Sequence, residues 1–161
     1  MKFICTGGTI DSAYDVDICT AVPMDQTFIP TYLKKYIKHD LENVSFEQIC
    51  MKDSRLITEE DLDKVIDIIT NSKEDKFVVT IGTYKLFTAA QYVKQNLSRK
   101  DCVVSFTGAM YPLFNFAHTD AGYNIGAAIT NSTLNKNGVY VIIAGKICDP
   151  SQKFALHTED H

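Results

Sequence analysis

The chain has 161 residues, of which 45% are hydrophobic and 22% are charged, and its formal net charge is −4. A chain of this length buries roughly 70% of its unfolded surface on folding, so it can form a core without disulfides or metal. This near-average composition excludes intrinsic disorder and fibrous repeats, and the lack of a basic surplus argues against nucleic acid as the main partner.

Cysteine usage and apolar run lengths bear on the compartment. The chain has five cysteines without a CxxC pair or a Cys/His cluster, so zinc is not expected, and neither is any other metal or cofactor. No segment approaches the roughly 18 apolar residues of a membrane helix, and the apolar run at the start is too short for a signal peptide. The sequence predicts a cytoplasmic protein with reduced thiols and no membrane partner.

Short runs rich in Val, Ile and Phe alternate with helical patterns along the whole chain. Nearly continuous apolar runs of this length are typical of strands buried on both faces of a parallel sheet. The predicted strands are residues 2–5, 44–50, 77–81, 102–107 and 139–144.

Four helices are predicted between or beside these strands. The first, at about residues 31–39, follows Pro30. Before the second, Thr58 and Asp61 resemble a capping box. Apolar residues at helical spacing mark the remaining three helices. They are Leu62, Val65, Ile66 and Ile69, then Leu86, Ala89, Ala90 and Val93, then Ile125, Ala128 and Ile129, with the last helix ending near residues 135–138.

This alternation predicts an α/β fold, a doubly wound and mostly parallel sheet with helices on both faces. No linker or internal repeat interrupts the pattern, so residues 1–161 are expected to form one domain. Ligands of such sheets bind beyond the carboxyl ends of the strands, where the strand order reverses. Functional residues are therefore expected in the loops that follow the strands.

Those loops carry glycines, hydroxyls and a few charges. TGGTID follows the first strand, KDSR the second, GTYK the third and TGAM the fourth. Two glycines permit a sharp turn and a close approach to a ligand, although a plain glycine turn explains the first motif equally well. Ser54 or Thr119 alone fits a helix cap. Four such loops at one edge of a sheet favour a functional cleft.

Taken in order, the segments TGGTID, KDSRLIT, VTIGTY, FTGAMYP and HTDAGYNIGAA resemble the bacterial-type L-asparaginase family, which are amidohydrolases with a threonine nucleophile. The resemblance runs from about Phe3 to about Gly145. It covers the larger, N-terminal domain of the usual two-domain enzyme and is strongest to the short single-domain members. It implies the fold of that domain with the C-terminal domain absent, hydrolysis of a small amide or amino-acid amide to a carboxylate and ammonia, and a homo-oligomer (dimer or tetramer).

The resemblance also implies roles for single residues. Thr9 is the nucleophile, Tyr14 on the following loop assists it, and Thr83 is the second catalytic threonine. Ser54 holds the α-carboxylate of the substrate. The remaining substrate-binding residues are Gly8, Asp53, Gly82, Tyr84 and Ala109, of which Asp53 alternatively only holds its loop.

Three positions depart from the family pattern, the first being Ile81, where the family has a histidine. The family supports its second threonine with an aspartate and with a lysine six residues before the glycine of TGAM, and these positions hold Tyr84 and Cys102 here. Lys85 and Lys100 are candidates to replace the lysine, and the alternative for both is an exposed side chain. Loss of the aspartate leaves a substrate α-ammonium unpaired, which costs on the order of a hundredfold in affinity.

Two functions stay open at this point. The first is an amidohydrolase that cleaves L-asparagine or a related amide. An amide without a free α-amino group would suit Tyr84 better than L-asparagine does. The second is a binding or regulatory protein that keeps the cleft and has lost the chemistry. A structural protein with a vestigial cleft ranks below both. The sequence leaves open whether the loop over residues 11–29 closes over the site.

Overall fold

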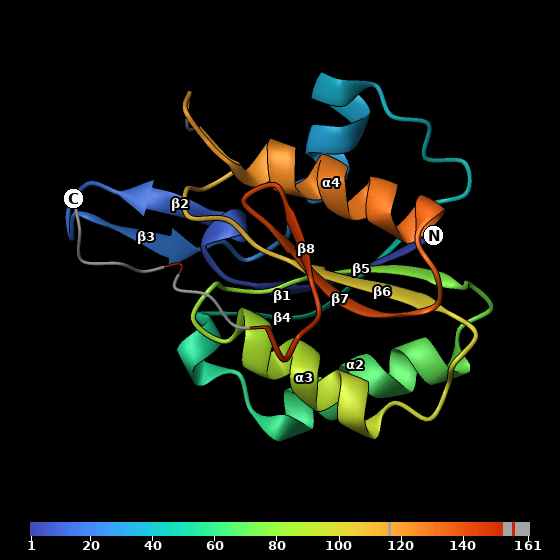
Figure 1. Cartoon of the computed structure of the whole chain (residues 1–161). Coiled ribbons are helices and arrows are strands. Elements are labelled where there is room, and N and C mark those ends of the chain that lie inside the picture. Colours follow the sequence, from blue (N-terminus) through green and yellow to red (C-terminus); the bar gives the residue numbers. More distant parts are fainter. Residues whose placement is uncertain (116, 153–155, 157–161) are drawn as a thin grey trace.

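The computed structural model describes residues 1–115, 117–152 and 156, and its centre is a six-stranded sheet (Figure 1). Five strands are parallel and the sixth is antiparallel to its neighbour. The predicted α/β fold with a mostly parallel sheet is confirmed, and every predicted strand is present. In spatial order the strands are β4 (Ser45–Lys52), β1 (Lys2–Gly7), β5 (Lys76–Thr80), β6 (Val103–Thr107), β7 (Gly138–Ile143) and β8 (Lys146–Cys148).

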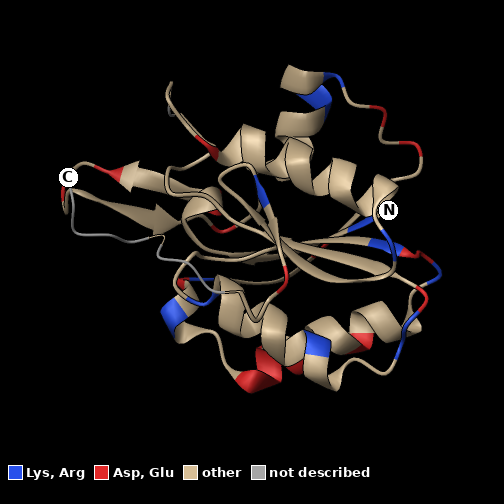
Figure 2. Ribbon diagram, viewed as in Figure 1, with Lys and Arg blue, Asp and Glu red and all other residues tan. Residues whose placement is uncertain are grey.

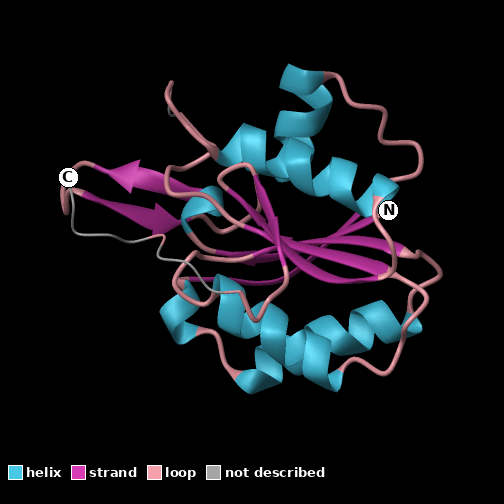
Figure 3. Ribbon diagram, viewed as in Figure 1, coloured by secondary structure: helices cyan, strands magenta, loops and turns pink. Residues whose placement is uncertain are grey.

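Helices cover both faces of this sheet, as Figure 3 shows. Two long helices pack on one face, and one long helix with a short one packs on the other. The short helix continues as a π-helical turn over Tyr32–Ile37. The helices are α2 (Glu59–Asn71) and α3 (Leu86–Asn96) on the first face, and α4 (Ala121–Leu134) and α1 (Ile29–Thr31) on the second.

The side chains of the strands fill both layers alternately. In β1, Ile4 packs with the α2 and α3 layer, whereas Phe3 and Cys5 pack with the α1 and α4 layer. In β5, Val79 packs with the α2 and α3 layer, and Val78 packs with the α1 and α4 layer. Successive side chains of a strand point to opposite faces, so a strand covered by helices on both sides must be apolar throughout.

The order of the strands creates a reversal between β1 and β5. From β1 the chain crosses to β4 on one side, and it then returns to β5 on the other side of β1. The carboxyl ends of β1, β4 and β5 are therefore neighbours at one edge of the sheet. In doubly wound sheets the crevice at such a reversal is the usual place for a ligand.

A hairpin that the sequence did not predict projects from this edge (Figure 1). It consists of β2 (Ser12–Asp15) and β3 (Thr20–Pro23), which pair only with each other. Each strand has four residues, too few for a recognisable alternation of apolar and polar side chains. Strand β8 has only three residues and was not predicted, for the same reason.

Charged residues of both signs are interspersed over the periphery of the molecule (Figure 2). This arrangement agrees with the small net charge of −4. Within the part of the chain that the structure describes, no helix has the length and apolar character needed to cross a membrane.

Candidate functional site

Glycines bring three loops into direct contact at the reversal between β1 and β5. Gly8 has φ of +82°, and a Cβ atom placed on it would lie 2.3 Å from the backbone nitrogen of Gly82. A Cβ atom on Gly82 would lie 2.6 Å from Ser54 Oγ. The loop after β1 therefore packs on the loop after β5, which packs on the loop after β4. A side chain at Gly8 would both strain the backbone and push these loops apart.

The three loops and the hairpin enclose a cavity of about 40 Å³. The structure thus brings together seven residues that the sequence analysis placed in the site. Among these seven, Thr9, Ser54 and Thr83 each bring an aliphatic hydroxyl group from the end of a different strand. The described part of the chain contains no group of three or more His, Cys, Asp and Glu residues that could hold a metal ion. The lining residues are Gly8, Thr9, Ser12, Ala21, Pro23, Asp53, Ser54, Gly82, Thr83 and Tyr84.

Ser54 is an unusual polar group in this lining. Its side chain is 1% exposed, and its Oγ atom makes no hydrogen bond in the structure. A short 3-10 turn over Ser54–Leu56 fixes the residue, because Asp53 Oδ1 accepts a hydrogen bond from the backbone of Arg55 at 2.8 Å. A buried hydroxyl without a partner is costly and uncommon. The cavity therefore holds an oxygen that a bound polar group could satisfy.

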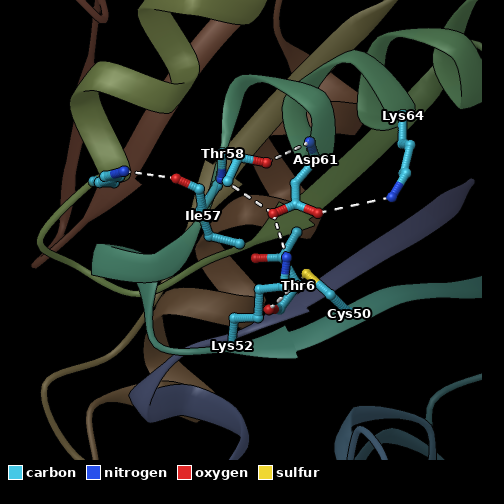
Figure 4. Close-up of polar contacts among 8 residues, drawn as sticks. Thr6, Cys50, Lys52, Ile57, Thr58, Asp61 and Lys64 are labelled. Atoms are coloured by element: carbon cyan, nitrogen blue, oxygen red, sulfur yellow. Dashed lines mark hydrogen bonds and ion pairs between the residues drawn. The ribbon is translucent and has the colours of Figure 1, made fainter.

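Buried Asp61 anchors the loop that carries Ser54 (Figure 4). Its carboxylate lies 2.6 Å from Lys52 Nζ and 3.9 Å from Lys64 Nζ. The same carboxylate accepts a hydrogen bond from the backbone of Thr58 at 3.1 Å, while Thr58 Oγ1 accepts one from the backbone of Asp61. This pair is the predicted capping box of α2, which is confirmed. Asp61 thus ties the end of β4 to the start of α2, on either side of the loop.

The lysines that the sequence analysis considered are held elsewhere. Lys85 Nζ donates to the carbonyl of Ile57 at 2.6 Å, and Lys100 Nζ donates to the carbonyl of Leu97 at 2.6 Å. Cys102 is buried at the amino end of β6. Five residues of strand, about 16 Å, separate that position from the carboxyl end. The expectation of a supporting lysine position at residue 102 is therefore wrong, because no side chain there reaches the cavity.

Two other predicted site residues lie outside the lining. Tyr14 is 50% exposed on β2, where it pairs with Ala21. Because directly paired residues share a face of a hairpin and Ala21 lines the cavity, Tyr14 lies on the cavity side but two pairs further out than Ser12 and Pro23. Ala109 is fully buried in the core beside α1 and α4. The three hairpin residues of the lining were not predicted, because the segment has no clear pattern.

Asp11 holds both ends of the hairpin. Its carbonyl accepts a hydrogen bond from the backbone of Met24 at 3.0 Å, and its carboxylate accepts from Thr27 Oγ1 at 2.8 Å and from the backbone of Phe28 at 2.9 Å. Burial raises the pKa of Asp11 to about 6 in spite of these hydrogen bonds. Burial, and then the charge of Asp11, raises the pKa of the Cys5 thiol to about 12. The hairpin is thus fastened through a carboxyl group that is costly to ionise.

Comparisons with known proteins agree with this geometry. The family model for the N-terminal domain of asparaginase matches residues 1–160. The sequence matches no protein of curated function. The fold matches the thermostable L-asparaginase of Thermococcus kodakarensis at 25% identity with a TM-score of 0.75, over 93% of this chain and 46% of that protein.

Two further solved structures are similar to the same extent. The probable cytoplasmic L-asparaginase of Campylobacter jejuni has 25% identity and a TM-score of 0.79, over 98% of this chain and 49% of that one. L-asparaginase I of Vibrio cholerae has 22% identity and a TM-score of 0.76, over 98% of this chain and 48% of that one. The chain therefore spans about half the length of these structures.

The contact between Gly8 and Gly82 predicts a steep cost for a single methyl group. Gly8→Ala should lower the free energy of unfolding by about 3 kcal/mol, because the methyl group meets backbone atoms and φ is positive. The control is Gly126→Ala in α4, where nothing lies within 4 Å of the added Cβ and alanine should stabilise the helix by up to about 1 kcal/mol. Urea unfolding measures both. A Gly8→Ala protein as stable as the wild type would contradict the packing described.

The raised pKa of Asp11 predicts a specific dependence of stability on pH. Because the folded chain binds this proton more tightly than the unfolded chain, the contribution of Asp11 to stability is full below about pH 4 and is lost as the pH rises through about 6. Asp11→Asn should therefore be more stable than the wild type at pH 7, by up to about 3 kcal/mol, with the gap closing at pH 4.

Unfolding by urea at both pH values checks this prediction. The control is Asp17→Asn in the exposed turn of the hairpin, which removes a carboxyl group while keeping the contacts that Asp11 makes. An Asp11→Asn protein whose difference from the wild type does not change with pH would show that the carboxyl group is not held as described.

Proposed function

The chain belongs to the asparaginase family, and from that premise we propose that it hydrolyses a small carboxamide to a carboxylate and ammonia with Thr9 as the nucleophile. The observation that carries the proposal is the grouping of Thr9, Thr83 and the unpartnered hydroxyl of Ser54 in one cavity. Ser54 would receive its missing hydrogen bond from a polar group of the substrate, which recovers the free energy that its burial costs.

The reaction would proceed in two steps. Thr9 Oγ attacks the amide carbon, the carbon–nitrogen bond breaks, and ammonia leaves with the proton of the threonine. Water then hydrolyses the resulting ester, which releases the carboxylate and regenerates Thr9. A threonine hydroxyl is a weak nucleophile and needs a group that accepts its proton. We assign this role to Tyr14, which lies on the cavity side of the hairpin, and the transfer of a proton to the leaving nitrogen to Thr83.

Substrate entry requires the hairpin to move. The cavity of about 40 Å³ has room for about one water molecule, and Ala21 and Pro23 of β3 form part of its wall. An outward movement of the hairpin would enlarge it, and the return movement would bring Tyr14 toward Thr9. Loops that close over a substrate and complete the catalytic set are common in enzymes.

A binding protein without chemistry is the second candidate function. It is favoured because the described residues that line the cavity include no lysine or histidine that could support a proton transfer. Such a protein would be stabilised by its ligand and would release no product.

Assembly and compartment form part of the same proposal. We propose a homo-oligomer, a dimer or tetramer, in which a second copy covers the outer side of the hairpin, where Val16 and Ile18 are exposed. We propose the cytoplasm because all five cysteines are free and one similar structure is described as a probable cytoplasmic L-asparaginase.

Ammonia release tests the proposed nucleophile. The wild-type protein should release ammonia from at least one member of a panel of L-asparagine, L-glutamine, D-asparagine and N-blocked amides. Thr9→Ala should reduce this rate about a thousandfold or more, because the attacking atom is gone. Thr70→Ala, on the exposed side of α2, should keep the wild-type rate. Equal rates for Thr9→Ala and the wild type would exclude Thr9, and no release by folded protein would favour the binding function.

A further inference from the structure

Arg55 lies beside the cavity and contacts two of the residues that line it. Its Nε and Nη2 atoms donate to the two carboxylate oxygens of Asp53 at 3.0 and 2.7 Å. Its guanidinium carbon also lies 5.0 Å from the centre of the Tyr84 ring. Asp53 and Tyr84 both line the cavity and come from different loops. A single positive charge is therefore bound to a carboxylate and an aromatic face of the site at the same time.

These two groups are the ones that would otherwise bind an ammonium group of a substrate. Among the described residues of the lining, Asp53 is the only carboxylate. An ammonium group in a protein site needs an anion or the face of an aromatic ring as its partner. Arg55 already engages Asp53 through both oxygens, and its hydrogen bonds lower the pKa of that carboxyl group. A second cation would therefore compete with Arg55 for the carboxylate and would be repelled by its charge.

An uncharged or anionic group meets no such obstacle. The side chain of Arg55 has five N–H donors, of which the two bonds to Asp53 use only part. Ser54 Oγ, which has no partner, can donate one more hydrogen bond to an oxygen of a ligand. The side of the cavity formed by Ser54, Asp53 and the adjacent Arg55 thus combines hydrogen-bond donors with a positive charge, which is suited to a carboxylate.

We propose that Arg55 makes this site select carboxylates that carry a primary amide but no α-ammonium group, of which the monoamide of succinic acid is the simplest. Arg55 acts here as a specificity-determining residue. The proposal rests on the proposed function for the position of the amide near Thr9. The predicted preference between ligands does not depend on whether the amide is hydrolysed.

L-asparagine and succinamate are a matched pair of probes, because they differ only in the α-ammonium group. Dissociation constants are measured from the thermal stabilisation of the full chain, and ammonia release is measured with the same two compounds. The wild type should bind succinamate about tenfold or more tightly than L-asparagine. Arg55→Gln removes the charge and releases the carboxylate of Asp53, so it should reduce this ratio about tenfold. Lys136→Gln removes an exposed charge at the opposite edge of the sheet and should leave the ratio unchanged.

The outcomes separate this inference from the proposed function. Preference for succinamate that depends on Arg55, with no ammonia from either compound, would support the selectivity and contradict the hydrolase. Ammonia release with a preference for L-asparagine in the wild type would overturn the role of Arg55 and leave the hydrolase intact. A ratio that Arg55→Gln does not change, or failure of both compounds to bind, would also overturn it. Arg55→Lys, which keeps the charge but not the two-bond geometry, should retain part of the preference.

Discussion

The contact between Gly8 and Gly82 is the constraint on which the site depends. Neighbouring strands of a sheet lie about 4.8 Å apart, so the loops that leave β1 and β5 can touch only if neither carries a side chain between them. A Cβ atom on Gly8 would lie within 2.3 Å of Gly82, which leaves no room for any other residue. Because the backbones meet, Thr9 and Thr83, which each follow one of these glycines, line the same small cavity.

The hairpin is the part that we propose moves against this rigid base. It pairs with no strand of the main sheet, and Asp11 fastens its two ends. The burial of that carboxyl group opposes its ionisation, so the fastening is maintained at a cost in stability at neutral pH. In the proposed opening, a hairpin fixed at its base and unpaired with the main sheet would move away from the cavity without disturbing the β1, β4 and β5 loops. This arrangement reconciles a cavity of about 40 Å³ with a substrate several times larger.

Much of the fold could be predicted from the sequence, because long periodic segments specify their own structure. The five parallel strands and the α2 helix with its capping box at Thr58 and Asp61 are examples. The hairpin could not be predicted, because two strands of four residues carry too little pattern. The site was approached through the loops after the strands, and the strand order explains why these loops meet. The lysine position assigned to residue 102 was wrong, because Cys102 directly precedes β6 and the cavity lies beyond the other end of that strand.

The placement of charge distinguishes this site from a simple pocket with hydroxyl groups. Arg55 neutralises Asp53, which is the only carboxylate of the described lining, and lies against the ring of Tyr84. The charge of Arg55 beside Asp53 therefore favours anions on this side of the cavity, while Ser54 and the two threonines supply the polar groups inside. The same few contacts thus account for both the proposed reaction and the proposed choice of substrate.

Acid quench of the protein during turnover of an amide, followed by peptide mass spectrometry, tests the central claim most directly. The account predicts an acyl group of the substrate on the peptide that contains Thr9, attached to the hydroxyl of that residue and lost on incubation with water. An acyl group on Ser54, Thr83 or any other residue would contradict it. Steady release of ammonia without any acylated peptide would contradict it as well.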